Sequence, residues 1–432
     1  MGTVRKKRWI TIINFKKDEK DLYKVKDKKE NALLVSNDKT SIKELGQLAD
    51  TSGVHTIKYF TYRSDKINPA YYIGKGNLEK IKDIIENFDI NLVIFDNQLS
   101  PAQLRNIEEE LDAKILDRNQ LIMDIFALHA KSKESKIQVE LAQLEYLLPR
   151  LVGRGKELSR LAGGIGTRGP GETKLEVDRR RIEKKIYRLK EKLKDIKGDR
   201  QVQRKSRKDP IVSLVGYTNA GKSTILNLLT GDNSLVEDQL FATLDSRARS
   251  YELPNGKNII MTDTVGFIKN LPHQLIASFR STLEEIKEAD LILHIIDASD
   301  EEVDNKIKVV ENELVELGIQ DKPILKVFNK IDLIDSHTKK DLEIQHPEAV
   351  FISATESFNK DKLIERLNNF VEARMDRYSL EIPYDKASIV ETLYNRGIVE
   401  KEKYKNEHIF IDAYIPSTLS KKLEKYIVNS KN

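Results

Sequence analysis

The chain has 432 residues, of which 39% are hydrophobic and 33% are charged, with a net charge of +5 and no cysteine. This length suffices for two to four domains. The lack of cysteine excludes disulfides, thiolate catalysis and cysteine-based zinc sites, and it fits a reducing compartment. The longest apolar run, residues 291–296, is broken by His294 and has the length of a strand, so we expect no membrane span and a cytoplasmic location.

Strand-like and helix-like segments alternate in the first third of the chain, which predicts an N-terminal α/β domain at residues 1–133. Expected strands are residues 9–15, 55–62 and 91–95, and expected helices are residues 41–50, 77–87 and 101–111. The last helix has a clear start signal, because Ser100 can cap free amides and Pro101 suits a first helical turn. Gly74 and Gly76 are too few for a nucleotide-binding fingerprint.

Two apolar stripes predict a long antiparallel helical hairpin at residues 134–200. Leucines recur with helical spacing between residues 141 and 151, and isoleucines and leucines do so between residues 175 and 196. Helices with such stripes bury them against each other. Pro149 should kink or interrupt the first helix, because proline removes a backbone hydrogen bond.

The predicted tip of this hairpin is the glycine-rich segment GGIGTRGPGE, residues 163–172. It formally contains the dinucleotide pattern GxGxxG, but no strand precedes it and no βαβ unit surrounds it, so we reject that interpretation. A glycine-dense loop that carries Arg168 suits a narrow space lined with RNA, because its backbone can approach bases and phosphates closely. A flexible turn is the alternative. Candidate RNA contacts at the tip and on the second helix are Gly163, Gly164, Gly166, Thr167, Arg168, Gly169, Gly171, Arg179, Arg180 and Arg181.

Positive charge is concentrated in the hairpin and in the basic linker expected after it, residues 201–209. Between residues 150 and 208 there are 21 lysines and arginines against eight aspartates and glutamates. Such a concentration is the electrostatic signature of a nucleic-acid partner. A solvated helix face is the alternative interpretation.

Four guanine-nucleotide signatures predict a P-loop GTPase domain, a mostly parallel sheet with helices on both faces, at residues 210–374. They are GYTNAGKS at residues 216–223, DTVG at 263–266, NKID at 329–332 and SAT at 353–355. In the first, Gly216 and Gly221 let backbone amides approach the phosphates. Lys222 would reach the β- and γ-phosphates, and Ser223 would place its hydroxyl on Mg²⁺.

Base choice is expected from the third signature. The Asp332 carboxylate can accept hydrogen bonds from guanine N1–H and the N2 amino group, and adenine lacks both donors, which favours guanine strongly. Asn329 and the stem of Lys330 would complete the base pocket. Ser353 and Ala354 would bring a backbone amide near the guanine O6.

Several residues bear on hydrolysis and on ions. Asp263 would hold Mg²⁺ through water, the Gly266 amide would face the γ-phosphate, and Thr243 is the candidate switch threonine. Phe267 stands where signalling GTPases often carry a water-positioning glutamine, which predicts slow intrinsic hydrolysis that a partner accelerates; simple packing of the ring is compatible with this. Asn219 leaves a K⁺ ion beside the phosphates as an open alternative.

The complete set of candidates comes from these signatures and from residues 241–243. Nucleotide-binding candidates are Gly216, Tyr217, Thr218, Asn219, Ala220, Gly221, Lys222, Ser223, Thr224, Phe241, Ala242, Thr243, Asp263, Thr264, Val265, Gly266, Asn329, Lys330, Asp332, Ser353, Ala354 and Thr355. Catalytic candidates are Lys222, Thr243 and Gly266, and metal candidates are Ser223, Thr243 and Asp263, the last through water.

The tail, residues 375–432, predicts a small α/β domain. Its order is strand, helix, strand, strand, helix at residues 380–382, 387–396, 397–404, 408–414 and 417–428. No catalytic constellation occurs in it, and the seven histidines of the chain lack metal-ligand spacing.

At this point the chain resembles a known family, the HflX GTPases, over about residues 60 to 370. The matching segments are YYIGKGNLEKI (71–81), IFDNQLSPAQLRNIE (94–108), QVELAQLEYLLPRL (138–151), GGIGTRGPGETKLEVDRRRI (163–182), DQLFATLD (238–245) and DTVGFI (263–268). Ser246 departs from the pattern, where proline is expected, and this puts the conformation of that loop in question but not Thr243.

The resemblance implies a function that spacing alone does not. HflX proteins bind the large (50S) ribosomal subunit, contacting 23S rRNA and ribosomal proteins, and their GTPase activity is stimulated by ribosomes. They dissociate stalled or idle 70S ribosomes, notably under heat stress, and the hairpin loop approaches the peptidyl-transferase centre. Some relatives rescue antibiotic-stalled ribosomes, and the sequence does not distinguish a housekeeping from a resistance protein.

Two other function classes stay open from the residues. The first is a large-subunit assembly factor or RNA-binding module that uses GTP as an occupancy sensor. The second is a signalling switch with protein partners only, against which the basic hairpin argues. The sequence is silent on oligomeric state, and a monomer is the expectation.

Overall fold

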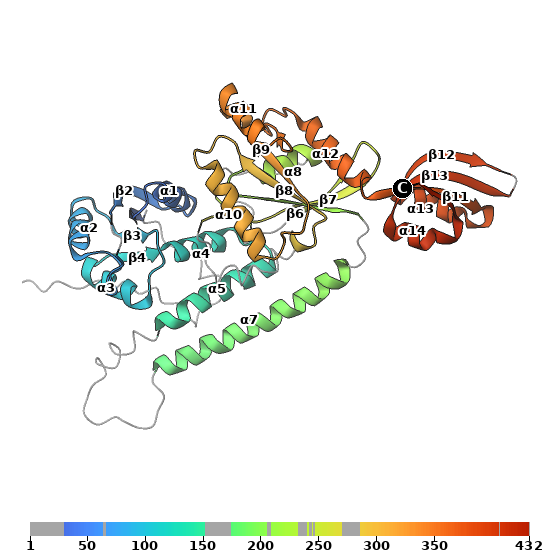
Figure 1. Ribbon diagram of the computed structural model, residues 1–432. Coiled ribbons are helices and arrows are strands. Elements are labelled where there is room, and N and C mark those ends of the chain that lie inside the picture. Colours follow the sequence, from blue (N-terminus) through green and yellow to red (C-terminus); the bar gives the residue numbers. More distant parts are fainter. Residues whose placement is uncertain are drawn as a thin grey trace, which may run out of the picture. The chain divides into compact units, whose positions relative to one another are not determined.

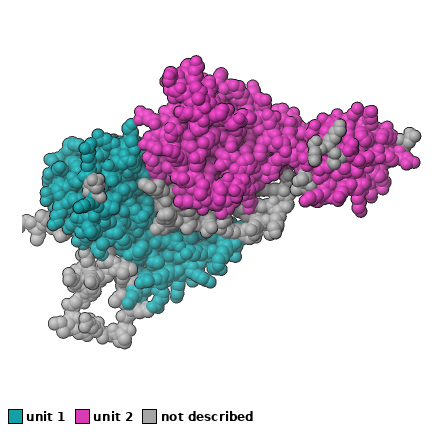
Figure 2. All heavy atoms as spheres, viewed as in Figure 1, with its two compact units in different colours: residues 1–196, 271–278 teal, residues 197–270, 279–432 magenta. Residues whose placement is uncertain are grey.

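The computed structural model describes residues 30–63, 66–151, 174–204, 209–231, 240–241, 244, 247–269, 286–405 and 407–431. The chain forms two compact units, residues 1–196 with 271–278 and residues 197–270 with 279–432 (Figure 2). Three sheets occur in the described residues, and they confirm the expected α/β class. No helix among these residues is long and apolar enough to cross a membrane.

The first unit begins with a parallel four-stranded sheet in the order β2-β1-β3-β4 (Figure 1). Its strands are β1 (Asn31–Ser36), β2 (His55–Thr61), β3 (Leu92–Phe95) and β4 (Lys114–Asp117), and its helices are α1 (Ser41–Thr51), α2 (Lys75–Asn87), α3 (Pro101–Leu111) and α4 (Arg118–His129). Helix α3 begins as predicted, since Ser100 and Gln103 form a reciprocal capping box before it. The strand predicted at residues 9–15 lies outside the described residues.

Sequence patterns missed three elements of this sheet, namely β1, β4 and α4. Strands β1 and β4 are short and almost fully buried, so they lack the alternation of a half-exposed strand. Helix α4 is apolar around most of its circumference, with Leu121, Ile122, Met123, Ile125 and Phe126 all buried. A helix buried on all sides has no amphipathic stripe to detect.

Two long helices form the middle region. Helix α5 (Lys133–Leu151) and helix α7 (Lys174–Arg204) run in opposite directions in Figure 1. They share an apolar cluster that includes Ile137, Leu141 and Leu144 of α5 and Ile182 and Leu189 of α7. An ion pair of Lys190 with Glu145 at 2.7 Å and another of Lys185 with Glu140 flank this cluster.

The ends of these helices differ from the prediction. Pro149 lies inside α5, which continues to Leu151, so the proline does not interrupt the helix in the described residues. Helix α7 extends to Arg204 and so occupies part of the expected linker. The glycine-rich tip, residues 163–172, lies outside the described residues.

The second unit contains the predicted GTPase sheet, in the order β10-β9-β8-β5-β7-β6. Its strands are β5 (Ile211–Gly216), β6 (Arg247–Glu252), β7 (Asn258–Asp263), β8 (Leu291–Asp297), β9 (Ile324–Asn329) and β10 (Val350–Phe351), and its helices are α8 (Lys222–Thr230), α10 (Val303–Glu316), α11 (Ser336–Gln345) and α12 (Lys360–Glu372). All pairs are parallel except β6 with β7. The carboxyl ends of the parallel strands therefore meet at one edge, where ligands of such sheets bind.

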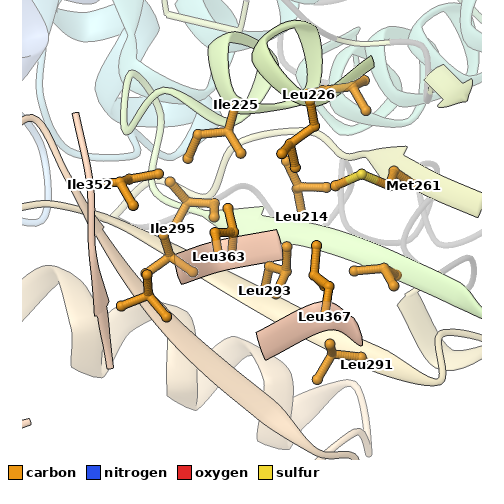
Figure 3. Close-up of a cluster of buried hydrophobic side chains, with 14 of the residues drawn as sticks. Leu214, Ile225, Leu226, Met261, Leu291, Leu293, Ile295, Ile352, Leu363 and Leu367 are labelled. Atoms are coloured by element: carbon orange, nitrogen blue, oxygen red, sulfur yellow. The ribbon is translucent and has the colours of Figure 1, made fainter. Parts of the chain in front are cut away.

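Apolar side chains on both faces fix this sheet. Figure 3 shows one face, where Leu214, Met261 and Leu293 of the strands pack against Ile225 of α8 and Leu363 of α12. A second cluster on the other side joins strands β8, β9 and β10 to helices α10 and α11. Helices thus cover both faces, as predicted for this class of domain.

The tail folds into an antiparallel sheet in the order β12-β13-β11-β14. Its elements are β11 (Met375–Pro383), α13 (Ala387–Arg396), β12 (Ile398–Tyr404), β13 (His408–Pro416), α14 (Ser417–Leu423) and β14 (Ile427–Lys431). This βαββαβ order is the ferredoxin-like arrangement. The predicted end of the last helix, residue 428, was wrong, because the last residues of the tail form an edge strand that pairs with β11.

Candidate functional site

The four signatures meet at the carboxyl edge of the GTPase sheet. The phosphate loop follows β5, DTVG begins at the end of β7, and NKID begins at the end of β9. SAT follows β10, which pairs with β9. Parallel pairing brings these strand ends to one edge, so segments more than 100 residues apart form one site.

Tight backbone packing shapes the phosphate loop. Asn219 and Gly221 have left-handed backbones, with φ of 60° and 91°. A Cβ added to Gly216 would lie 2.2 Å from the Ile295 carbonyl oxygen, and one added to Gly221 would lie 2.2 Å from Asn329 Nδ2. Only glycine fits these two positions, which leaves the loop backbone close to any bound phosphate.

Lys222 is buried at the start of α8, as a phosphate-binding lysine requires. Its Nζ donates to the carbonyl oxygens of Gly216 at 3.2 Å and Tyr217 at 2.9 Å. Burial lowers the pKa of Lys222 to about 8, and the nearby Asp263 carboxylate opposes this shift. The Lys222 ammonium therefore lies within the loop, where phosphate oxygens could replace the two backbone carbonyls as its hydrogen-bond acceptors.

A pair of oxygen ligands suitable for Mg²⁺ lies beside the lysine. Ser223 Oγ donates to Asp263 Oδ2 at 2.6 Å, and the Asp263 side chain is fully buried. Carboxylate and hydroxyl oxygens are the ligands that Mg²⁺ prefers, and the ion usually takes its other ligands from water and substrate phosphates. No cluster of three or more histidine or acidic side chains in the described residues could hold a metal alone. The residues thus fit a Mg²⁺ that arrives with the nucleotide, while Thr243 and Ala242 lie outside the described residues.

The DTVG segment lies along the phosphate loop like a short extra strand. Phe267 N–H donates to the Gly216 carbonyl at 3.0 Å, and Thr218 N–H donates to the Phe267 carbonyl at 2.9 Å. Thr264 Oγ1 donates to the Leu214 carbonyl at 2.7 Å. The Phe267 side chain is buried, consistent with the packing role considered from the sequence.

The base-recognition residues are held by contacts that cross the site. Asn329 Nδ2 donates to the Ala220 carbonyl, and Asn329 Oδ1 accepts from Ala354 N–H, both at 3.0 Å. Lys330 Nζ lies 2.7 Å from Asp297 Oδ2. Asp332 is exposed, so its carboxylate is accessible to a base. The two bonds of Asn329 join three of the signatures to one another.

The remaining candidates differ in exposure. Tyr217, Val265 and Phe241 are buried, Thr224 is half-buried on α8, and Asn219 is exposed. Ser353 is buried, and its hydroxyl lies 3.2 Å from that of Thr355. Among the RNA candidates, Arg179, Arg180 and Arg181 are exposed on α7, and Gly163, Gly164, Gly166, Thr167, Arg168, Gly169 and Gly171 lie outside the described residues.

Two features escaped the sequence analysis. Asp297, the partner of Lys330, ends the buried strand β8, and an acidic residue at the carboxyl end of a parallel strand could have signalled its place in the site. A basic stripe on α7 is formed by Arg180, Lys184, Arg188 and Lys192, all of them exposed. Its four-residue repeat places these side chains along one face of the helix and was readable from the sequence.

Three family models match consecutive segments of the chain. Residues 39–127 match the family described as GTP-binding GTPase N-terminal, residues 129–207 match GTP-binding GTPase middle region, and residues 211–330 match 50S ribosome-binding GTPase. The chain is 46% identical over 412 residues to GTPase HflX of Caldanaerobacter subterraneus subsp. tengcongensis, covering 93% of this chain and 94% of that protein. It is 38% identical over 387 residues to GTPase HflX of Escherichia coli strain K12, covering 87% and 91%.

Solved structures include a GTP-binding protein of the hyperthermophilic archaeon Sulfolobus solfataricus in complex with GDP. It is 29% identical to this chain, and the match covers 79% of this chain and 98% of that protein with a TM-score of 0.44.

Proposed function

Because the chain belongs to the HflX family and is a GTPase associated with the 50S ribosome, we propose that it dissociates stalled or idle 70S ribosomes. The proposal extends to rescue of heat-stalled or antibiotic-stalled ribosomes as the cellular role. It includes a cytoplasmic location and a monomeric state. The observation that carries it is the match through all three family segments, which include the middle region between the two α/β parts.

The proposed domains follow this division. We assign residues 1–133 to an N-terminal domain, 134–200 to the hairpin, 201–209 to a linker, 210–374 to the GTPase domain and 375–432 to a C-terminal domain. The hairpin would carry the RNA contacts, with its tip reaching toward the peptidyl-transferase centre. Its second helix supports this role, because the exposed basic stripe Arg180, Lys184, Arg188 and Lys192 suits a phosphate backbone.

Bound GTP would organise the site through the residues described above. Lys222 would turn from the loop carbonyls to the β- and γ-phosphates, and Gly266 N–H would face the γ-phosphate. Asn329, Lys330 and Asp332 would hold the guanine. Ordering of the switch segments by the γ-phosphate would create the ribosome-binding state, and hydrolysis would release it.

Ser223 and Thr243 would hold Mg²⁺ directly and Asp263 would hold it through water, and the ion would neutralise charge on the phosphates. Ser223 and Asp263 already lie within hydrogen-bond distance of each other, which supports this assignment. A K⁺ ion beside Asn219 belongs to the same proposal. The Asn219 side chain is exposed and its backbone is left-handed, so the side chain could turn toward the phosphates.

The test is GTP turnover by the purified chain, alone and with 50S subunits, beside a sucrose-gradient profile of intact 70S ribosomes. We expect 50S subunits to accelerate turnover, and GTP to convert the 70S peak into subunits. Acceleration without loss of the 70S peak would favour the assembly-factor or occupancy-sensor function instead. No acceleration would contradict both.

The tip requires its own test, a chain in which residues 163–172 are replaced by an equally long glycine–serine segment. We expect this variant to retain ribosome-free GTP turnover, because the GTP site lies in the other unit, and to lose splitting. Splitting at the wild-type level would contradict the proposed role of the tip. Turnover of the wild-type chain at different K⁺ concentrations, with Na⁺ as the control, tests the K⁺ assignment separately.

A further inference from the structure

The buried Phe267 leaves a requirement of the reaction unmet. Hydrolysis needs a water molecule held in line with the γ-phosphorus, and a phenylalanine side chain offers no hydrogen bond to it. Phe267 is 2% exposed, and its backbone N–H and carbonyl are bonded to Gly216 and Thr218. Neither its side chain nor its backbone can hold the water in this conformation, so another group is needed.

One hydroxyl of the phosphate loop fits that need. Thr218 is 7% exposed, and its buried Oγ1 has no hydrogen-bond partner among the described residues. Two neighbouring hydroxyls are already bonded, since Ser223 donates to Asp263 and Thr264 donates to the Leu214 carbonyl. Buried polar atoms without a partner are uncommon, and each calls for an explanation such as a catalytic role or an absent water.

The position of Thr218 is also suitable. A Cβ added to Gly266 would lie 2.8 Å from Thr218 Cγ2, 2.9 Å from Thr218 Cα and 3.0 Å from Lys222 Nζ. The Thr218 methyl group and the Lys222 ammonium therefore both lie close to Gly266, and a rotation of about 120° about the Thr218 Cα–Cβ bond would bring Oγ1 to the place of the methyl group. Because the lysine and the Gly266 amide are the groups expected on the γ-phosphate, Thr218 would lie next to the reacting phosphorus.

We propose that the Thr218 hydroxyl holds the attacking water during GTP hydrolysis, in place of the missing glutamine. The inference rests on the GTPase activity of the HflX family and does not require ribosome splitting. The hydroxyl accepts one hydrogen bond from the water and donates its own to a γ-phosphate oxygen. The water oxygen bonds to the γ-phosphorus, the bond from that phosphorus to the β–γ bridging oxygen breaks, and the water's proton leaves with the phosphate. Thr218 ends unchanged.

The test compares Thr218→Val, which keeps the shape and removes the hydroxyl, with Thr218→Ser, which keeps the hydroxyl. Single-turnover hydrolysis of GTP is measured with the full chain and without ribosomes. We expect Thr218→Val to lower the rate about 100-fold, as loss of a positioned catalytic hydrogen bond does. Its Kd for GTP and GDP should stay within about threefold, since the contact is made in the transition state. Thr218→Ser should restore hydrolysis to within about threefold of wild type.

Thr230→Val is the matched control, because it makes the same substitution at the far end of α8, where the Thr230 hydroxyl donates to the Leu226 carbonyl. We expect wild-type hydrolysis from it. Wild-type hydrolysis by Thr218→Val would overturn the proposal. Equal losses in rate and in GTP affinity, or failure of Thr218→Ser to restore the rate, would assign Thr218 to packing and overturn it too. Because no ribosome is present, absence of splitting by the wild-type chain would leave this result unaffected.

Discussion

Asn329 donates its side-chain amide to the Ala220 carbonyl at 3.0 Å, and so joins the base-recognition signature to the phosphate loop. The same side chain accepts from Ala354 N–H at 3.0 Å. Three segments that are expected to contact different parts of the nucleotide are thus held together by one side-chain amide. Its exposure is 2%, so both hydrogen bonds are shielded from water.

Asn329→Ala should remove both bonds and leave two buried backbone groups without partners. We expect the free energy of unfolding to fall by about 2 to 6 kcal/mol, since each of the two buried groups left without a partner costs roughly 1–3 kcal/mol. The affinities for GTP and GDP should both fall, because the base-recognition segment and the phosphate loop are no longer held together by Asn329. Urea unfolding and nucleotide titration measure the two effects. Asn305→Ala, an exposed position on α10, is the control and should change neither.

Gly221 and Gly231 have similar backbone conformations, so alanine substitutions at the two positions distinguish backbone strain from a steric clash of the added Cβ. Gly221 and Gly231 have φ of 91° and 70°, so alanine at either position is strained by roughly 1–2 kcal/mol. A Cβ at Gly221 would meet Asn329 Nδ2 at 2.2 Å, whereas one at Gly231 meets nothing within 4 Å. We expect Gly231→Ala to bind GTP normally and Gly221→Ala to lose GTP binding. Equal affinities of the two variants for GTP would contradict this expectation, because they would show that Asn329 moves away from the added Cβ without loss of binding.

The buried Lys222 predicts a pH dependence of nucleotide binding. Its pKa in the nucleotide-free chain is lowered to about 8 by burial, so the ammonium loses its proton as the pH rises through 8. Phosphates require the charged form. We expect the affinity for GDP to fall by about fourfold from pH 7.0 to pH 8.5, following the charged fraction of the lysine. Titration calorimetry at both pH values measures it. Unchanged affinity would place the pKa near that of an exposed lysine.

Asp332→Asn should change the preferred base. An asparagine can still accept from guanine N1–H, but its amide nitrogen faces the guanine N2 donor, and two donors cannot bond. Xanthine carries a carbonyl there and restores the match. We expect affinity for GTP to fall by at least about 100-fold and XTP to bind better than GTP, because one guanine donor loses its partner. Competition of the two nucleotides decides it. Retained preference for GTP would remove Asp332 from the base pocket.

The basic stripe on α7 predicts salt-dependent ribosome binding. The triple variant Lys184→Gln, Arg188→Gln, Lys192→Gln removes three exposed charges without touching the apolar cluster of α5 and α7. We expect weaker binding to 50S subunits. The slope of log affinity against log salt concentration should become less negative by about two to three, because fewer counterions are released. Intrinsic GTP turnover should be unchanged.

A control for this variant removes the same charge elsewhere. Lys308, Lys340 and Lys362 are exposed on α10, α11 and α12, and their replacement by glutamine should leave the salt dependence as in wild type. Pelleting of 50S subunits at several salt concentrations compares the variants. An equal loss in both would attribute the effect to net charge instead of to the stripe.

Local chemistry explains what could be predicted from the sequence. A phosphate loop needs its glycines, lysine and serine within eight consecutive residues, so its pattern is visible without a structure. The same holds for the start of α3, where the capping residues Ser100 and Gln103 lie three positions apart. Buried elements such as β1, β4 and α4 could not be predicted, because an element that is apolar on all sides shows no regular alternation of polar and apolar residues.

Contacts between distant segments required the tertiary structure. The bond of Ser223 to Asp263 spans 40 positions and depends on β7 lying beside β5. The bond of Asn329 to Ala220 spans 109 positions and depends on β9 lying beyond β8 in the same sheet. The unpartnered hydroxyl of Thr218 is likewise a property of its neighbours. The sequence by itself determined the nucleotide and the family pattern, because those reside in short motifs. Packing of the parallel strands decided which side chains share the site, since strand order is set by burial of the whole sheet.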